Sequence, residues 1–411
     1  MKEMAQSGWP FSARSRIGLN AANFFQAESV GVLLPVLSAF LKDARWRYDA
    51  IGVATATAGL GTLLFQTPAG IITDKVASRR TLFAIVSITT GLCFVLLPIV
   101  PPAFAWIDPL LFLSGITQSF FAPLLGALAL ALAGKQFLGP LVGENQSWNH
   151  AGNIVAALLA IGLVKWFGTA GVFYSVGFAS LIGAASVFLI RRNELDEARG
   201  SGRKDGPTIE HDQSWRSLLG DRAILGLFVA ISLFHFANAP VLPLTALYVK
   251  MLGGSDSLMT STVLMAQVVM VPVAWLSGRM CESRGRKAVM MIGFWALPLR
   301  ILSYTFASSP RAVVALQLLD GIGAGIYGVV VVAMAADLTA GKGKFNSLLG
   351  LFATAQAVGG VVGPVVSGII VQHLGFKATF WAFAVLALAA AMALSFLVPE
   401  TSRQDHPSPL R

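Results

Sequence analysis

Long apolar runs alternate with short polar segments along the whole chain. A helix that crosses a bilayer needs about 20 mostly apolar residues, and the chain has twelve runs of that kind. The predicted helices of the first half are 17–40, 51–73, 81–100, 107–133, 146–167 and 170–190, and those of the second half are 222–247, 258–280, 288–308, 312–336, 347–372 and 378–398. We therefore expect an all-α membrane protein with twelve transmembrane helices.

The polar loops contain a repeated motif. Residues 70–80 read GIITDKVASRR, and residues 278–287 read GRMCESRGRK. Gly278 lies 208 residues after Gly70, and Glu282 lies 208 residues after Asp74. A fixed offset of this kind indicates an internal duplication. The chain is therefore expected to form two six-helix bundles of the same orientation, over residues 1–190 and 222–411.

Residues 191–221 form the one long polar segment between the two predicted bundles. The segment has dense mixed charge together with Gly and Pro, which is typical of a solvated linker. We expect it to act as a cytoplasmic tether.

Basic residues are distributed unequally between the two sets of loops. The tails and the even-numbered loops hold 22 Lys and Arg, whereas the opposite loops hold seven. Because cytoplasmic loops are enriched in Lys and Arg, this bias predicts that both termini and both motif copies are cytoplasmic.

Composition excludes several classes of protein. Charged residues make up 12% of the chain, against about 25% in soluble proteins. The net charge of +10 is spread over short clusters, so we expect no nucleic-acid partner. Cys93 and Cys281 form no disulfide or metal pattern. The N-terminus lacks the features of a cleaved signal peptide.

The duplicated loop resembles that of the major facilitator superfamily, in which a GxxxD-xx-G-R-[RK] pattern follows the second helix and a weaker copy follows the eighth. In this chain the second copy keeps the spacing better, because the first has Ala77 at the position of the second glycine. The resemblance implies two parallel-repeat bundles with a substrate site near the midplane, and motif loops that set the open and closed populations. It also implies that the protein lies in a bacterial inner membrane. The residues that carry it are Gly70, Asp74, Arg79, Arg80, Gly278, Glu282, Gly285, Arg286 and Lys287.

Away from the helix ends, four acidic or basic residues fall within the predicted spans, where charge is costly and indicates function. Glu28 is the first candidate for proton coupling, with Asp320 and His235 as further candidates, and Asn238 is a possible partner of His235. Arg300 and Asp320 lie at similar depth on neighbouring helices, so we expect a charge pair. The charge pair is either structural, or a gate or an anchor for a substrate anion. The alternative to proton coupling at Glu28 and His235 is that each is a buried group with a single hydrogen bond.

Polar side chains within the spans predict the lining of a substrate cavity. Some recur at helical spacing in the fifth helix, where unsatisfied polar groups would be expensive; close helix packing is the alternative. The predicted lining residues are Asn20, Asn23, Asn149, His150, Asn153, Asn238, Tyr327 and Gln356.

No ATP-binding motif occurs in the chain, so transport would draw on an ion gradient or the substrate's own gradient. The sequence favours a monomeric secondary transporter without a cofactor or enzymatic activity, which exports a small organic molecule in exchange for protons. Proton-symport uptake of a metabolite or organic anion is the first alternative. A membrane receptor or enzyme is the second, although it would leave the duplicated motif unexplained.

Overall fold

The computed structural model describes residues 9–28, 33–46, 48–203 and 220–402. This part of the chain is helical and contains no strand. The first repeat contributes α2 (Ala13–Glu28), α3 (Leu33–Asp43), α4 (Tyr48–Lys75), α5 (Arg79–Leu96), α6 (Phe104–Gln118) and α7 (Phe121–Ser186). The second contributes α9 (Arg222–Asn238), α10 (Val241–Met251), α11 (Asp256–Arg284), α12 (Arg286–Tyr304), α13 (Pro310–Leu338) and α14 (Phe345–Leu397).

Three glycines divide the two longest helical stretches into single spans. Within α7 the backbone leaves helical geometry at Gly134 (φ +63°) and Gly168 (φ +67°), and within α14 it does so at Gly375 (φ +79°). Such positive φ angles suit glycine because it has no Cβ. Gly168 and Gly375 lie 207 residues apart, so the same break occurs at the same place in both repeats. With these breaks counted, the described helices correspond to eleven of the twelve predicted spans. In the first span, 17–40, α2 and α3 lie on either side of residues 29–32, which are outside the described part of the structure.

Two predicted spans are each interrupted by a short break. The span predicted at 107–133 consists of α6 and the start of α7, which are separated at Ser119 and Phe120. The span predicted at 222–247 consists of α9 and α10, which are separated at Ala239 and Pro240. Pro240 explains the second break, because proline lacks the backbone N–H that would continue α9.

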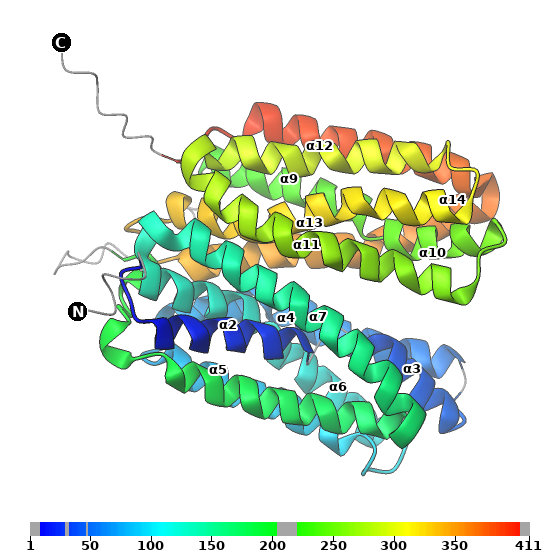
Figure 1. The fold of residues 1–411 in the computed structure, drawn as a ribbon, viewed down its shortest axis with the longest axis horizontal. Coiled ribbons are helices and arrows are strands. Elements are labelled where there is room, and N and C mark those ends of the chain that lie inside the picture. The colour runs from blue at the N-terminus through cyan, green and yellow to red at the C-terminus, as the bar shows by residue number, and fades with distance from the viewer. Residues whose placement is uncertain (1–8, 29–32, 47, 204–219, 403–411) are drawn as a thin grey trace. The chain divides into compact units, whose positions relative to one another are not determined.

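The chain divides into two compact units by its internal contacts. Unit 1 comprises Met1–Phe137, Glu144–Gly206 and Gly341–Val358, and unit 2 comprises Leu138–Gly143, Pro207–Ala340 and Gly359–Arg411. Each unit therefore contains a short piece of the other repeat: the start of α14 belongs to unit 1, and residues 138–143 of α7 belong to unit 2. In unit 2, α13 packs along α11 and α12, and Figure 1 shows these helices running lengthwise beside one another.

Candidate functional site

A cluster of polar side chains lies within the apolar core of unit 2. Arg300 of α12 is 2% exposed and forms an ion pair with Asp320 of α13. Its Nη2 atom also donates a hydrogen bond to Oδ1 of Asn238 on α9, at 2.7 Å. One guanidinium group therefore connects three helices, and we call these three residues the arginine cluster.

Several polar atoms around the arginine cluster have no hydrogen-bond partner. They are Nε of Arg300, the hydroxyl of Tyr304 one turn further along α12, and Nε2 of His235 on α9. The His235 ring packs edge-on against Tyr327, with 4.6 Å between ring centroids. Asn238 does not serve as the partner of His235, because its carbonyl oxygen accepts from Arg300 instead. Several hydrogen-bonding atoms next to the arginine cluster are therefore buried without a partner.

A second group of polar side chains lies between α2 and α7 in unit 1. Nδ2 of Asn149 donates to the backbone oxygen of Asn23 at 3.1 Å and to Oε1 of Gln26 at 3.0 Å. Asn153 donates to the backbone oxygen of Asn149 at 3.2 Å. Asn149 of the predicted polar stripe thus contacts α2, and Asn153 bonds to Asn149; we call Asn23, Gln26, Asn149 and Asn153 the amide seam.

An ion pair that the sequence did not reveal lies at the start of α2. Glu144 of α7 accepts from Nε of Arg16 at 2.8 and 2.9 Å, and from Nη2 of Arg16 at 2.7 Å. Nδ2 of Asn20 donates to the same carboxylate at 2.5 Å. Arg16 and Glu144 are 128 residues apart, so no local spacing rule could have paired them.

The first motif copy binds the start of α14 within unit 1. Oδ1 of Asp74 accepts from the backbone N–H of Asn346 at 3.1 Å and from its side-chain amide at 2.9 Å. Oδ2 accepts from the backbone N–H and the hydroxyl of Ser347, at 2.7 and 2.6 Å. A carboxylate is well suited to this place, because the first N–H groups of a helix have no partner within it.

The first glycine of each motif copy lies very close to the backbone of another helix. A Cβ atom added to Gly70 would come within 2.1 Å of the Asn346 backbone oxygen, and one added to Gly278 within 2.3 Å of the Gly139 backbone oxygen. The first glycine of each motif copy therefore lets two backbones meet. Glu282, the counterpart of Asp74, accepts a hydrogen bond from the Gly139 backbone N–H.

The start of the predicted linker is partly buried against the first motif copy. Arg79 is 1% exposed and donates to the backbone oxygen and the carboxylate of Glu197, at 2.7 and 2.6 Å, and to the hydroxyl of Ser201. Ser201 is 2% exposed and donates to the backbone oxygen of Asp74 at 2.9 Å. Residues 191–203 carry two short 3-10 turns at Arg192–Glu194 and Arg199–Ser201. Within them Gly200 and Ser201 are buried, whereas residues 191–193 are exposed.

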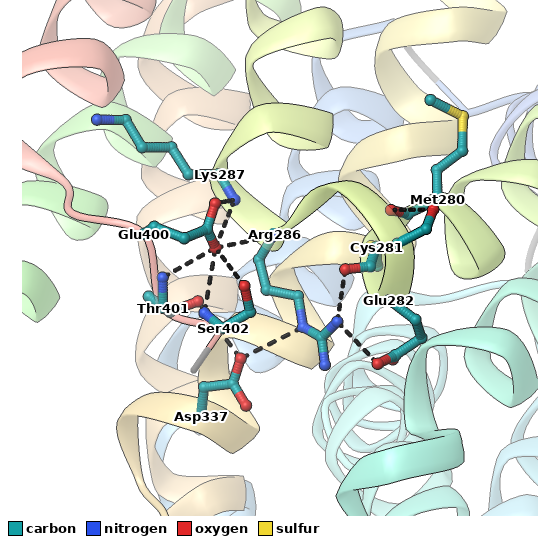
Figure 2. A network of polar contacts seen from close by, with 10 residues as sticks. Met280, Cys281, Glu282, Arg286, Lys287, Asp337, Glu400, Thr401 and Ser402 are labelled. Atoms are coloured by element: carbon teal, nitrogen blue, oxygen red, sulfur yellow. Dashed lines mark hydrogen bonds and ion pairs between the residues drawn. The ribbon is translucent and has the colours of Figure 1, made fainter. Parts of the chain in front are cut away.

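The second motif copy is held by a comparable network in unit 2, which Figure 2 shows from close by. Arg286 contacts Glu282 at 3.1 Å and Asp337 of α13 at 3.3 Å, and it donates to the Cys281 backbone oxygen at 2.7 Å. Arg286 lies 207 residues after Arg79. Both repeats therefore bury an arginine here, although different carboxylates hold it.

The second basic residue of each motif caps the last helix of its repeat. Nη1 of Arg80 donates to the backbone oxygen of Ile190 at 2.6 Å, and Nζ of Lys287 donates to the backbone oxygen of Ser395 at 2.7 Å. Cations are favourable near helix C-termini, where carbonyl groups lack partners. The two motif copies thus share contacts that the repeat offset predicts.

Glu400 connects the segment after α14 to the start of α12 (Figure 2). Its carboxylate accepts from the backbone N–H groups of Arg286 at 2.8 Å, Lys287 at 3.1 Å and Ser402 at 3.1 Å. Burial opposes the charge on Glu400, yet the N–H groups of Ser402, Lys287 and Arg286 outweigh it and hold its pKa below the ordinary value of 4.5. The ionised carboxylate therefore stabilises the folded state.

This lowered pKa predicts how Glu400→Gln changes stability with pH. Near pH 7 the variant should unfold a few degrees below the wild-type protein, because it loses the charged acceptor. Since the folded-state pKa lies below 4.5, the stabilisation is complete above that value and is lost as pH falls through the folded-state pKa. Thermal unfolding of both proteins from pH 7 to pH 3.5 should show the difference closing at the acidic end. A difference that stays constant over this range would contradict the prediction.

The other predicted site residues lie outside these networks or have unassigned roles. Glu28 is the last residue of α2, and its side chain lies outside the described part of the structure. Gln356 is exposed on α14, and His150 is half-buried on α7 and makes a contact of its own. The structure thus brings together Asn238, Arg300 and Asp320, and separately Asn23, Asn149 and Asn153.

Comparisons with known proteins agree with this architecture. The sequence model described as Major Facilitator Superfamily matches residues 19–286 and 268–411. An uncharacterized MFS-type transporter of Mycobacterium tuberculosis is 33% identical over 392 residues, which cover 94% of each chain. The multi-drug resistance efflux pump PmrA of Streptococcus pneumoniae is 24% identical, over 88% of this chain and 90% of its own.

Solved structures show the same fold. The proton:xylose symporter XylE superposes with a TM-score of 0.71 over 95% of this chain and 96% of its own, at 18% sequence identity. The same family is indicated by the two motif copies at a fixed offset, by the twelve predicted spans in two repeats and by relatives that match over nearly the full length. This chain is a multi-pass integral membrane protein that belongs to the major facilitator superfamily of transporters.

Proposed function

We propose that this protein is a proton-coupled transporter that exports a small organic molecule across a bacterial cytoplasmic membrane, with both termini in the cytoplasm. The observation that carries the proposal is the arginine cluster, a buried ion pair with a third helix attached to it. Ionisable groups at this depth are costly and mark proton or substrate pathways in transporters. The similarity to PmrA, whose name describes an efflux pump, supports the outward direction.

Protonation of Asp320 would change the energy of the arginine cluster. Arg300 cannot release its own proton under ordinary conditions, so a neutral Asp320 leaves a guanidinium that is 2% exposed without its counter-charge. A buried charge without a partner is strongly unfavourable, and the helices that carry Arg300 and Asp320 are then driven to rearrange. Proton binding is in this way coupled to a change in the packing of α12 and α13, as alternating access requires.

Asn238 and the motif loops have separate roles in this scheme. Asn238 keeps Arg300 attached to α9 in either protonation state, because an amide oxygen accepts whether or not Asp320 is charged. Asp74 holds the start of α14, and Arg79 holds the first part of the linker. These contacts set how often α4 and the start of α14 separate. The substrate would bind elsewhere, along the amide seam between α2 and α7.

Purified protein in proteoliposomes tests the proposal. With a pH gradient imposed and a panel of drugs and metabolites supplied, the wild-type protein should accumulate at least one compound against its gradient. Glu28→Gln and Asp320→Asn should each abolish accumulation, whereas Asp43→Asn, which alters an exposed carboxylate at the end of α3, should not. Accumulation that persists when the pH gradient is collapsed would rule out proton coupling.

A second candidate function is proton-symport uptake of an organic anion. The unpartnered Nε of Arg300 and hydroxyl of Tyr304 favour it, because both can donate to a carboxylate. The same proteoliposomes distinguish the two, since a symporter moves its substrate in the direction of the protons and an exporter moves it in the opposite direction.

A further inference from the structure

Three arginines come together where the first helix of unit 1 begins and its last helix ends. Arg14 belongs to the first turn of α2, and Arg191 and Arg192 follow shortly after the 3-10 turn Val187–Leu189 that continues α7. The backbone N–H of Arg191 donates to the hydroxyl of Ser15 at 2.9 Å, so the two segments are in contact. We call Arg14, Arg191 and Arg192 the arginine rim.

The side chains of the arginine rim are accessible to a ligand. Arg14 and Arg192 are exposed, and within the described part of the chain neither side chain has an ion-pair partner. Arg191 is 44% exposed, and its contact with Oε1 of Glu194 is long, at 3.6 Å. The other oxygen of Glu194 accepts from two serine hydroxyls near the start of α2. Three positive charges therefore stand beside one carboxylate that already has partners.

Exposed apolar side chains adjoin the arginine rim. Ile17, one turn after Arg14 on the same face of α2, is 60% exposed, and Phe188 is 52% exposed. Both belong to predicted membrane spans, whereas the arginine rim lies just outside those spans. In an integral membrane protein, exposed apolar side chains of a span contact acyl chains. The guanidinium groups of the arginine rim then lie at the depth of the lipid headgroups.

The second repeat provides an internal comparison, because the same helices pack there in the same way. A Cβ atom added to Gly18 would lie 2.9 Å from the Cβ of Leu189, and one added to Gly226 would lie 2.9 Å from the Cβ of Leu397. Gly226 lies 208 residues after Gly18, and Leu397 lies 208 residues after Leu189. An offset of 208 therefore identifies the corresponding positions at this end of the two repeats.

At this offset the second repeat keeps the apolar surface and loses the positive charge. Phe396 corresponds to Phe188 and is 84% exposed. Pro399 and Glu400, however, stand at the positions of the last two arginines of the rim, and Glu400 accepts from backbone N–H groups at the start of α12. The first repeat alone thus combines the exposed apolar side chains with a set of three arginines.

From this arrangement we infer that the arginine rim binds the phosphate of an anionic phospholipid, whose acyl chains lie along Ile17 and Phe188. Guanidinium groups donate pairs of hydrogen bonds to phosphate oxygens, and basic clusters beside a membrane span attract anionic lipids. A lipid bound here contacts α2 through Arg14 and the end of α7 through Arg191 and Arg192. It therefore holds the first and last helices of the repeat together, whichever substrate or ion the protein carries.

Native mass spectrometry of the full-length protein in detergent can measure this binding. The wild-type protein should retain one molecule of phosphatidylglycerol, which has a net negative charge, and should bind the neutral headgroup of phosphatidylcholine about tenfold more weakly. The variant Arg14→Gln/Arg191→Gln/Arg192→Gln should bind phosphatidylglycerol about 100-fold more weakly, because each basic residue near a membrane surface contributes about fivefold.

Two further variants control for net charge and for folding. Arg222→Gln/Arg284→Gln/Arg311→Gln removes three exposed arginines of the second repeat and should bind phosphatidylglycerol as the wild-type protein does. The single substitution Arg192→Glu introduces the carboxylate that the second repeat has at this position. It should weaken binding by about 25-fold, because it changes the local charge by two.

Glycerol 3-phosphate separates a lipid site from a site for a soluble anion, because it has the phosphate without acyl chains. It should not displace bound phosphatidylglycerol. Displacement of the lipid by glycerol 3-phosphate, equal binding of the two lipids, or undiminished binding by the Arg14/Arg191/Arg192 variant would each overturn the inference. These measurements involve neither a transported substrate nor a pH gradient, so their outcome is independent of the proposed function.

Discussion

Asp320→Asn should destabilise this protein more than Arg300→Met, although the two substitutions remove the same ion pair. Asp320→Asn leaves the Arg300 guanidinium, which is 2% exposed, without a counter-charge and unable to become neutral. Arg300→Met leaves a carboxyl that can take up a proton. Breaking a buried pair from one side costs about 3–5 kcal/mol, and we expect Asp320→Asn to reach that range.

The double variant Arg300→Met/Asp320→Asn should recover most of the lost stability. It removes both charges, and replacing a buried pair by neutral groups is often close to neutral in stability. Chemical unfolding of the wild-type, single and double variants gives the coupling energy between the two residues. Effects of the single substitutions that simply add in the double variant would show that the two side chains do not interact in the folded protein.

Asp74→Asn should release the start of α14 from α4. Each Asp74 oxygen accepts from a backbone N–H, Oδ1 from Asn346 and Oδ2 from Ser347. Whichever way an asparagine is turned, its NH2 group therefore faces one of these donors and leaves it unpaired. An unpaired buried donor costs about 1–3 kcal/mol, so we expect the equilibrium between bound and released states to shift by about 30-fold, which corresponds to about 2 kcal/mol.

A disulfide reporter can measure this shift. The hydroxyls of Thr67 on α4 and Thr354 on α14 are 2.9 Å apart, so Thr67→Cys and Thr354→Cys should cross-link readily once Cys93 and Cys281 are replaced by serine. Adding Asp74→Asn should slow cross-linking, whereas adding Asp43→Asn should not. Substrate affinity of the cross-linked protein should be the same with and without Asp74→Asn. An unchanged cross-linking rate would mean that Asp74 does not hold these helices together.

The repeat was the most informative feature of the sequence. The 207-residue offset relates Gly168 to Gly375, and at both the backbone leaves helical geometry. Arg80 and Lys287 likewise cap corresponding helices. The offset predicts which positions of the two repeats correspond, so a contact found in one repeat indicates its counterpart in the other.

Contacts between distant residues could not be predicted in the same way. The mixed charge of residues 191–203 indicates a solvated segment, yet Glu197 and Ser201 accept hydrogen bonds from Arg79, a residue more than 100 positions earlier. Glu144 lies between the predicted spans 107–133 and 146–167, and its partner Arg16 belongs to another helix. In both cases the pairing depends on tertiary packing, about which hydrophobic periodicity carries no information.

The central claim is that the arginine cluster couples proton binding to transport. The double variant Arg300→Met/Asp320→Asn tests it most directly, because it should be folded and yet lack the carboxyl that binds the proton. In proteoliposomes the variant should carry substrate down its concentration gradient at a rate near that of the wild-type protein, and should fail to accumulate it when a pH gradient is imposed. Accumulation at the wild-type level would show that the cluster only stabilises the fold, and would contradict the account.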